Sequence, residues 1–146
     1  MAKRSQLDKA MEYASAELER VGDLEKLSRA VRTVVIIQAA QGIIDNGGLQ
    51  YFFESDFPNQ PPYAIVVDAY REIGAIVEAD AVAAAVSLFP FAEPHKNRAR
   101  RDEFLEHLHE NLSSPMWDLD GKLCGSEEVW RLLASDGGRK SQSCPS

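Results

Sequence analysis

A long apolar segment that stops at two consecutive glycines constrains the fold of this chain more than any other feature. Apolar residues recur with helical spacing from Leu24 to Ile44, and residues 34–44 are apolar on most sides of a helix. Asn46-Gly47-Gly48 follows, and both residue types tolerate the left-handed backbone with which helices commonly end. We therefore expect a central helix that is buried on most sides along 34–44 and stops at these glycines.

The same periodicity elsewhere predicts a chain built of helices. The predicted helices cover residues 5–20, 24–44, 49–56, 63–77, 81–89 and 98–112, with a last one after Ser126. The β-branched run 34–37 could instead form a strand, but no partner strand is evident. The pattern therefore predicts an all-α fold, a compact single-domain helical bundle of about six or seven helices.

Local signals place the boundaries of these segments. Asp23 and Asp80 are expected to be helix N-caps, because a short acidic side chain can accept a bond from a free backbone N–H. Residues 116–123 are expected to form a loop that leans on the core. Residues 136–146 contain no large apolar anchor, so we expect a single domain over 1–135 followed by a disordered tail.

No segment predicts export or insertion into a membrane. No apolar run approaches the roughly 18 residues that a spanning helix needs, and the charged N-terminus has no apolar signal region behind it. Two cysteines, Cys124 and Cys144, are too few for a disulfide framework. We therefore expect a cytoplasmic protein with no membrane partner.

The net charge of -7 comes from the middle of the sequence. Between Thr33 and His95 there are eight acidic residues and one basic residue, whereas the remainder is balanced. Such an excess repels nucleic acids and favours basic protein partners, although a solubilising surface is the simpler interpretation. Seven of these acids form our candidate interaction face: Asp45, Glu54, Asp56, Asp68, Glu72, Glu78 and Asp80.

No group of residues predicts a metal site or a cofactor site. His107 and His109 are two apart and so point to different sides of a helix, whereas a metal pair needs a spacing of three or four. The segment 118–121 resembles the start of a calcium loop, but Val129 stands where that loop needs a glutamate. We predict no metal ligands and no cofactor.

Catalysis has a single candidate, a pair of carboxylates. Asp68 and Glu72 are four apart on a predicted helix and could act as acid and base, joined by Glu54 or Asp56. A solvated helix face explains the same spacing more simply. We therefore assign no catalytic residues and keep a hydrolase-like enzyme using this pair as an alternative.

Two further clusters have both a structural and a functional interpretation. A basic cluster is expected to be an exposed helix start paired with Asp102, Glu103 and Glu106. It could instead bind phosphate or nucleic acid, or meet the acidic patch of a second copy in a homodimer; it comprises Lys96, Arg98, Arg100 and Arg101. An aromatic cluster is expected to pack in the core, or else to form the lip of a binding surface; it comprises Tyr51, Phe52, Phe53, Phe57 and Tyr63.

Three blocks together resemble a known bacterial family. They run from Asn46 to Ser55, from Asp68 to Ala75 and from Leu88 to Pro90. They resemble small helical domains long catalogued as a domain of unknown function, a family that includes a DNA-mimic protein, over about residues 31–112. The matching motif residues, which we take as mainly structural, are Asn46, Gly47, Gly48, Gln50, Tyr51, Phe52, Phe53, Ile73, Gly74 and Ala75.

The resemblance implies an all-α fold and a role in binding proteins. In the DNA-mimic member, acidic side chains imitate phosphate spacing and occupy the DNA-binding surface of a transcription factor, and that member is a dimer. Our leading hypothesis is a non-enzymatic acidic protein-binding domain whose partner is a basic protein such as a transcription regulator, without direct binding of nucleic acid. An immunity or antitoxin-like inhibitor is a further alternative.

Overall fold

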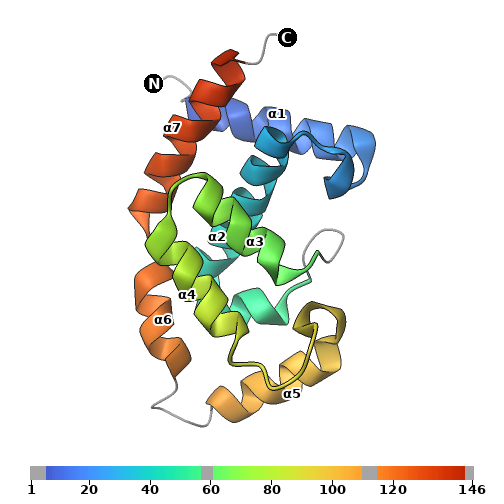
Figure 1. Cartoon of the computed structure of the whole chain (residues 1–146), viewed down its shortest axis with the longest axis vertical. Coiled ribbons are helices and arrows are strands. Elements are labelled where there is room, and N and C mark those ends of the chain that lie inside the picture. Colours follow the sequence, from blue (N-terminus) through green and yellow to red (C-terminus); the bar gives the residue numbers. More distant parts are fainter. Residues whose placement is uncertain (1–5, 57–60, 110–114, 144–146) are drawn as a thin grey trace.

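Helices make up most of the backbone that the computed structural model describes, which is residues 6–56, 61–109 and 115–143. These ranges contain seven α-helices, two short 3-10 turns and no strand, which confirms the predicted all-α class (Figure 1). The helices are α1 Gln6–Val21, α2 Arg29–Glu54, α3 Tyr63–Glu72, α4 Ile76–Val86, α5 Arg98–His109, α6 Pro115–Leu123 and α7 Glu127–Ser143; the 3-10 turns are Leu24–Lys26 and Pro94–Lys96.

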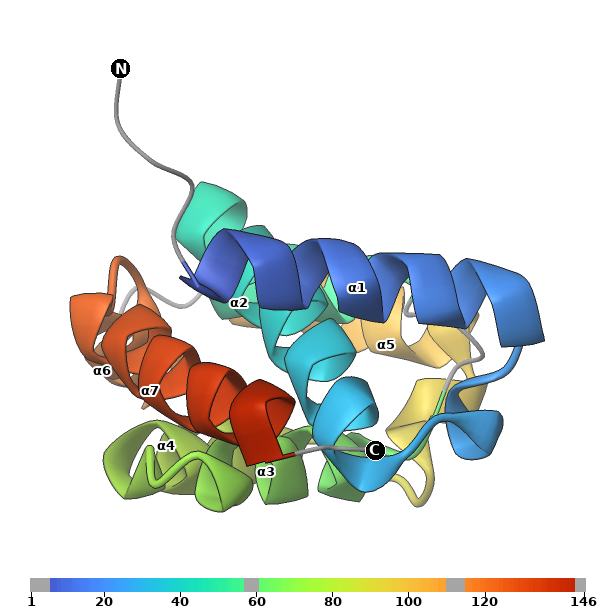
Figure 2. The same cartoon turned by 90° about the horizontal axis from the view of Figure 1, so that it is seen from above.

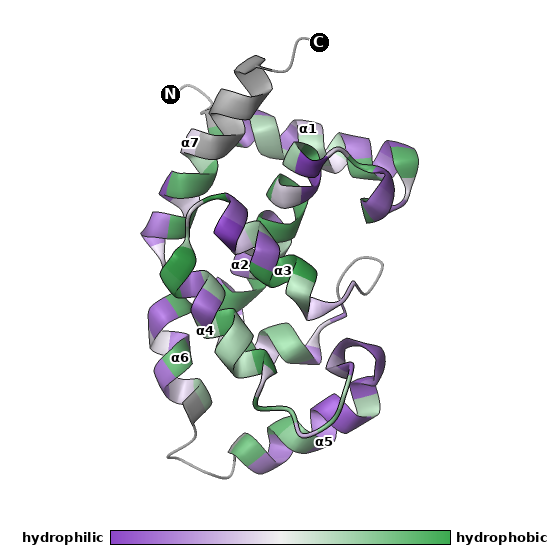
Figure 3. Cartoon of the chain, viewed as in Figure 1, coloured by the Kyte–Doolittle hydropathy of each residue, from purple (hydrophilic) through white to green (hydrophobic). Residues whose placement is uncertain are grey.

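Helix α2 is the central element of the bundle. It contacts α1, α3, α5, α6 and α7, and Figure 2 shows α1 on one side of it and the α3–α4 pair on the other. Ile37, Ala40 and Ile44 on α2 have no exposed surface. The predicted burial of the segment 34–44 on most sides is therefore confirmed, since neighbours surround the helix. In Figure 3 the peripheral helix α5, by contrast, mixes hydrophilic and hydrophobic turns.

Helix α2 begins later than Asp23, which we expected to be its N-cap. Asp23 caps the turn Leu24–Lys26 instead, where its Oδ1 accepts a 2.9 Å bond from the backbone N–H of Glu25. Ser28 is the cap of α2, since its Oγ accepts a bond from the N–H of Val31. The prediction that Asp23 caps the long helix was wrong. Asp23 caps only the short turn Leu24–Lys26, and Ser28, five residues later, caps α2.

The segment 63–77 is interrupted by a glycine that the periodicity did not reveal. Gly74 has φ of +86°, and the N–H of Ala75 donates to the carbonyl of Tyr70 at 2.9 Å, which ends α3. Helix α4 then begins at Ile76, so Asp80 lies within it and the prediction that Asp80 is an N-cap was wrong. The left-handed glycine decides the boundary because it breaks the helical bonding pattern.

Residues 116–123 form helix α6, whereas we expected a loop. Pro115 is its first residue, a position where the missing N–H of proline removes no helical bond. Met116 and Leu123 are buried. The acidic and glycine residues at 118–121 suggested a turn, but packing of the apolar side against the bundle outweighs their low helix propensity.

The last helix continues beyond the boundary that we predicted. The backbone is helical to Ser143, which differs from the disordered tail expected over 136–146. No proline interrupts the chain between Glu127 and Ser143, so the backbone bonds of a helix can all form there. The domain boundary at residue 135 stays a prediction, and residues 144–146, including Cys144, lie outside the described residues.

Candidate protein-binding surface

The glycines of the family motif form a kink in α2 that an aspartate of α6 stabilises. Gly48 has φ of +75° inside the helix, so the helical bond pattern breaks there and the N–H of Leu49 needs another acceptor. Asp120 supplies it, with its Oδ1 2.7 Å from that nitrogen. A Cβ on Gly48 would lie 3.1 Å from this oxygen, and one on Gly47 would lie 2.6 Å from the Cβ of Tyr51. Both glycines are therefore required by their neighbours.

Most aromatic residues that follow the kink pack inside the bundle. Phe53 meets Tyr63 and Phe89 edge to face, with ring centroids 5.2 and 5.0 Å apart, and Phe52 is also buried. Tyr51 differs, because 47% of its surface is exposed. The structural interpretation therefore fits Phe52, Phe53 and Tyr63, and the binding interpretation survives only for Tyr51. Phe57 lies outside the described residues.

A buried glutamine, Gln41, links the central helix to α3 and α6. Its amide nitrogen donates to Asp45 Oδ1 at 2.7 Å and to the carbonyl of Leu123 at 2.8 Å, and its Oε1 accepts from the Tyr70 hydroxyl at 2.8 Å. Burial raises the pKa of Tyr70, and the charges of Asp45 and Glu78 raise it further, so this hydroxyl stays a donor. The sequence showed Gln41 only as a polar interruption in an apolar run.

Two acids of the candidate face are engaged at the start of α7. Asp45 accepts from the backbone N–H of Gly125 at 2.8 Å and from the indole N–H of Trp130 at 3.1 Å. Glu78 is only 8% exposed and accepts from the hydroxyl of Ser126, the residue whose Oγ also accepts from the N–H of Val129. Both carboxylates stabilise a helix end, where a negative charge is favourable. These two acids therefore serve the fold.

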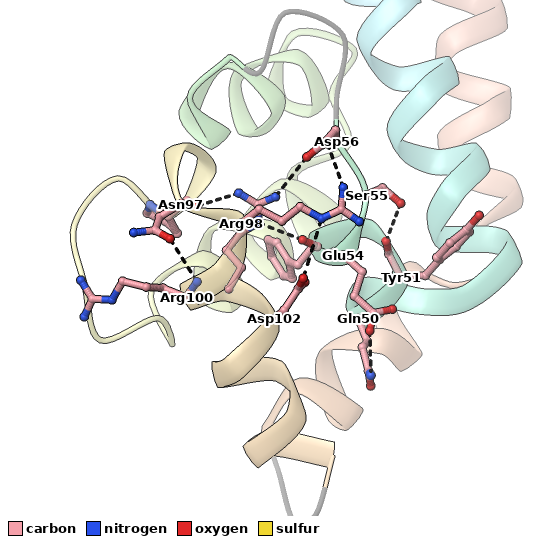
Figure 4. A network of polar contacts seen from close by, with 12 residues as sticks. Gln50, Tyr51, Glu54, Ser55, Asp56, Asn97, Arg98, Arg100 and Asp102 are labelled. Carbon is pink, nitrogen blue, oxygen red and sulfur yellow. Dashed lines mark hydrogen bonds and ion pairs between the residues drawn. The ribbon is translucent and has the colours of Figure 1, made fainter.

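Asp56 is the counter-ion of two arginines of α5 (Figure 4). Arg98 reaches one of its oxygens at 2.9 Å and Arg101 the other at 3.4 Å. Arg101 has no exposed side-chain surface, and it also donates to the carbonyls of Phe53, Pro94 and His95 at 2.8–2.9 Å. This buried arginine ties the end of α2 to α5, a role that the sequence prediction of an exposed basic cluster missed.

The other members of the basic cluster are engaged within the chain. Arg98 also pairs with Asp102, Lys96 pairs with Glu93 at 2.6 Å, and the guanidinium of Arg100 lies 4.3 Å from the centre of the Phe91 ring. The interpretation as an exposed helix start paired with Asp102, Glu103 and Glu106 is confirmed for Arg98 with Asp102, whereas Lys96 pairs with Glu93 instead. For Arg101 it was wrong about exposure, because the α2 and 3-10 carbonyls satisfy its donors inside the bundle.

The remaining acids lie along α3, α4 and the end of α2. Glu72 pairs with Arg29 at 2.7 Å and Asp80 with Arg71 at 3.1 Å. Asp68 is exposed and lines an open groove with Glu72, Arg29 and Arg32. Glu54 lies on another part of α2, where Gln50 donates to it at 3.4 Å.

These positions divide the candidate acidic face into separate environments. Asp45 of α2 and Glu78 of α4 bond to residues at the start of α7, and Asp56 bonds to α5. Asp68 and Glu72 lie on α3. The carboxylate pair of the enzyme alternative is therefore joined neither by Glu54 nor by Asp56 in its groove, and Arg29 neutralises one member of it.

One groove was not predicted from the sequence, because it depends on α6. It encloses about 120 Å³ between the end of α2, α5 and α6, and we name it the Trp117 groove. Its lining residues are Gly47, Gln50, Leu105, Leu108, Met116, Trp117 and Asp120. Burial raises the pKa of Asp120, and its bond from Leu49 opposes that shift. The sequence feature that could have indicated this groove is the spacing of Met116 and Asp120, which places them on one side of a helix.

Two classes of site are not found in the described part of the chain. Residues 6–56, 61–109 and 115–143 hold no group of three or more His, Cys, Asp or Glu side chains arranged to bind a metal ion. None of the described helices has the length and apolar character needed to cross a bilayer. Cys124 is an exposed free thiol.

Comparison with known proteins gives one match, at the level of the family. No curated protein and no solved structure matches the chain. The family model of the DMP19-like proteins matches residues 25–135, which includes the kink, the Gly74 turn and α6. Because the match covers most of the sequence, this chain belongs to the DMP19-like protein family, whose members are related to a DNA-mimic protein.

Proposed function

We propose that this chain is a non-enzymatic, cytoplasmic protein-binding domain whose acidic side chains engage the DNA-binding surface of a basic transcription regulator. Membership of the DMP19-like family is the observation that carries this proposal. The net charge of -7, which arises wholly from the central section, supports it, because complementary charge steers association with a basic surface.

The acids available to a partner are those whose carboxylates are not held by bonds that stabilise the fold. Asp45 and Glu78 are bound at the start of α7 and are excluded. Asp80 and Arg71 form an exposed pair, with 66% and 48% of their side-chain surfaces accessible. Exposed ion pairs contribute only about 0–1 kcal/mol to stability. Cations on a partner can therefore replace Arg71 as the counter-ion of Asp80. Asp56 is excluded as well, because it is the counter-ion of the buried Arg101. The available set is Glu54, Asp68, Glu72 and Asp80.

An affinity capture from the native host tests the proposal. At low salt, about 0.05 M, the wild-type chain should retain a DNA-binding protein, and at about 0.5 M it should release it, because salt screens exposed charges. The captured regulator should also be displaced by its own DNA. Recovery of no salt-sensitive DNA-binding protein would contradict the proposal.

A matched pair of variants locates the surface. The triple change Asp68→Asn, Glu72→Gln, Asp80→Asn should weaken capture strongly. The control Glu19→Gln, Glu103→Gln, Glu106→Gln removes the same charge from exposed positions outside the central section, and it should retain the partner. Equal loss in both variants would show that net charge acts without a defined surface.

A further inference from the structure

We propose that the Trp117 groove receives a single arginine side chain of the protein partner, with its guanidinium at Asp120 and its carbon stem against the apolar walls. This inference rests on the proposed function and deepens it. It names a specific anchoring contact, whereas the acids of α3 and α4 supply general attraction.

The groove has the shape and lining of a site for a long side chain with a charged end. Leu105, Leu108 and Met116 provide apolar walls, and Trp117, which is 50% exposed, presents its indole to an incoming group. An arginine stem can bury its methylene groups on such walls while its planar head stacks on the indole. Guanidinium groups stack on tryptophan more favourably than on other aromatic rings.

The negative charge of Asp120 in the groove favours a positively charged ligand group. Asp120 is acidic, and none of the other residues that line the groove is basic or acidic. Its Oδ1 accepts from the N–H of Leu49, and an ionised carboxylate has capacity for about four hydrogen bonds. Acceptor positions therefore remain for a guanidinium. Glu54, which accepts from the lining residue Gln50, adds a second negative charge nearby.

The fold holds this carboxylate in place before any ligand arrives. Asp120 is held at the kink of α2, because its Oδ1 accepts from the N–H of Leu49. A prepositioned acceptor reduces the ordering cost of binding. The motif glycines thus shape the groove: Gly47 lines it, and Gly48 lets Asp120 of α6 approach α2 closely.

The two tryptophans of the chain give a direct test by nuclear magnetic resonance. The isotopically labelled full chain is titrated with a short, capped glycine peptide that contains one central arginine. The indole N–H signal of Trp117 should shift with a Kd of about 1 mM, as expected for one side chain. The signal of Trp130, which is bonded to Asp45, should stay constant. The same peptide with citrulline, which has the shape of arginine without its charge, should not bind.

Three variants distinguish binding of the peptide in the groove from nonspecific attraction to the negative charge of the protein. Asp120→Asn keeps an oxygen for the Leu49 N–H but loses the charge, so Kd should rise about tenfold. Asp118→Asn removes the same charge from a neighbouring exposed position of α6 and should leave Kd within about twofold. Gln50→Lys leaves the Asp120 bond intact and places a cation at the groove, so it should abolish binding of the peptide.

The inference is overturned if the Trp117 signal does not move, if citrulline binds as well as arginine, or if Asp118→Asn weakens binding as much as Asp120→Asn. Each of these results concerns the groove alone. The proposed function fails separately, when the wild-type chain captures no salt-sensitive DNA-binding protein.

Discussion

Asp45 and Asp68 are both exposed aspartates of the acidic section, and the structure uses them differently. Asp45 accepts hydrogen bonds from Gln41, Gly125 and Trp130 and so connects α2 to the start of α7. Asp68 lines the open groove along α3, and no hydrogen bond or ion pair of its side chain is found within the described residues. The comparison shows that the contacts of an acid, and not its presence in an acidic section, decide whether it is available to a partner.

Among the variants proposed here, Arg101→Met, which removes the buried arginine of α5, should lower the free energy of unfolding most. The change leaves the carbonyls of Phe53, Pro94 and His95 without their donor inside the bundle, so the free energy of unfolding should fall by about 3–5 kcal/mol. Urea denaturation measures it. Arg100→Met, which removes an exposed arginine that stacks on Phe91, is the control and should cost less than about 1 kcal/mol. A similar loss of unfolding free energy in the two variants would show that the burial of Arg101 adds nothing to its contribution to stability.

The next largest effect is expected for Gly48→Ala. An alanine there is strained at φ of +75°, and its Cβ would lie 3.1 Å from the Asp120 carboxylate, so unfolding free energy should fall by about 2–3 kcal/mol. Gly42→Ala is the matched control, because nothing lies within 4 Å of a Cβ at that position. That control should be neutral or stabilise by up to about 1 kcal/mol. A harmless Gly48→Ala would show that the kink is not required.

Asp45→Ala and Asp68→Ala compare the two aspartates directly. Loss of three hydrogen bonds should cost Asp45→Ala about 1–2 kcal/mol of unfolding free energy, whereas Asp68→Ala should change it by less than about 0.5 kcal/mol. Thermal and urea unfolding of the two variants give the difference. Partner capture should show the reverse order, with Asp68→Ala the more affected. Equal stability losses would remove the distinction between the two regions.

A smaller effect should appear in the pH dependence of Asp120→Asn. Burial holds the pKa of Asp120 above its usual value in the folded state, so the folded chain retains this proton to higher pH than the unfolded chain. Ionisation as pH rises through that pKa therefore lowers the stability of the wild type. The stability of Asp120→Asn relative to the wild type should rise between about pH 3 and pH 6. A falling difference would contradict the desolvation of this carboxylate.

The smallest effect is expected for Glu72→Gln on the outer face. The Arg29 partner is 75% exposed, and exposed pairs contribute about 0–1 kcal/mol. The unfolding free energy should therefore fall by less than about 0.5 kcal/mol, and less still at high salt. Unfolding at two salt concentrations measures both. A loss comparable with that of Asp45→Ala would place Glu72 with the structural acids.

Local patterns predicted the elements whose causes are local. The buried character of α2 follows from its apolar residues, so it was accessible to periodicity. Turn chemistry gave the place of the interruption at Asn46-Gly47-Gly48, but we predicted the end of the helix there, and the structure has a kink after which α2 continues to Glu54. The break at Gly74 was missed because apolar spacing continues across it. Helix α6 was missed because its stability comes from packing on the bundle, which the local sequence does not show.

The candidate site was less predictable than the fold, because its roles depend on contacts between distant parts of the sequence. Gly125 and Asp45 are 80 positions apart, and Asp120 and Leu49 are 71 apart. No local pattern indicates which acid will meet which free N–H. The Trp117 groove exists only because residues of α5, α6 and the end of α2 come together there.

The order of neighbouring residues was enough to predict the helical composition, the buried central helix and the interruption at Asn46-Gly47-Gly48, and the residue counts give the net charge. The tertiary structure alone decided which acids stabilise helix ends and which remain exposed. The physical reason is that a carboxylate serves the fold only when a free N–H, a hydroxyl or a buried arginine lies within hydrogen-bond distance of it. Packing of helices far apart in the sequence sets that distance.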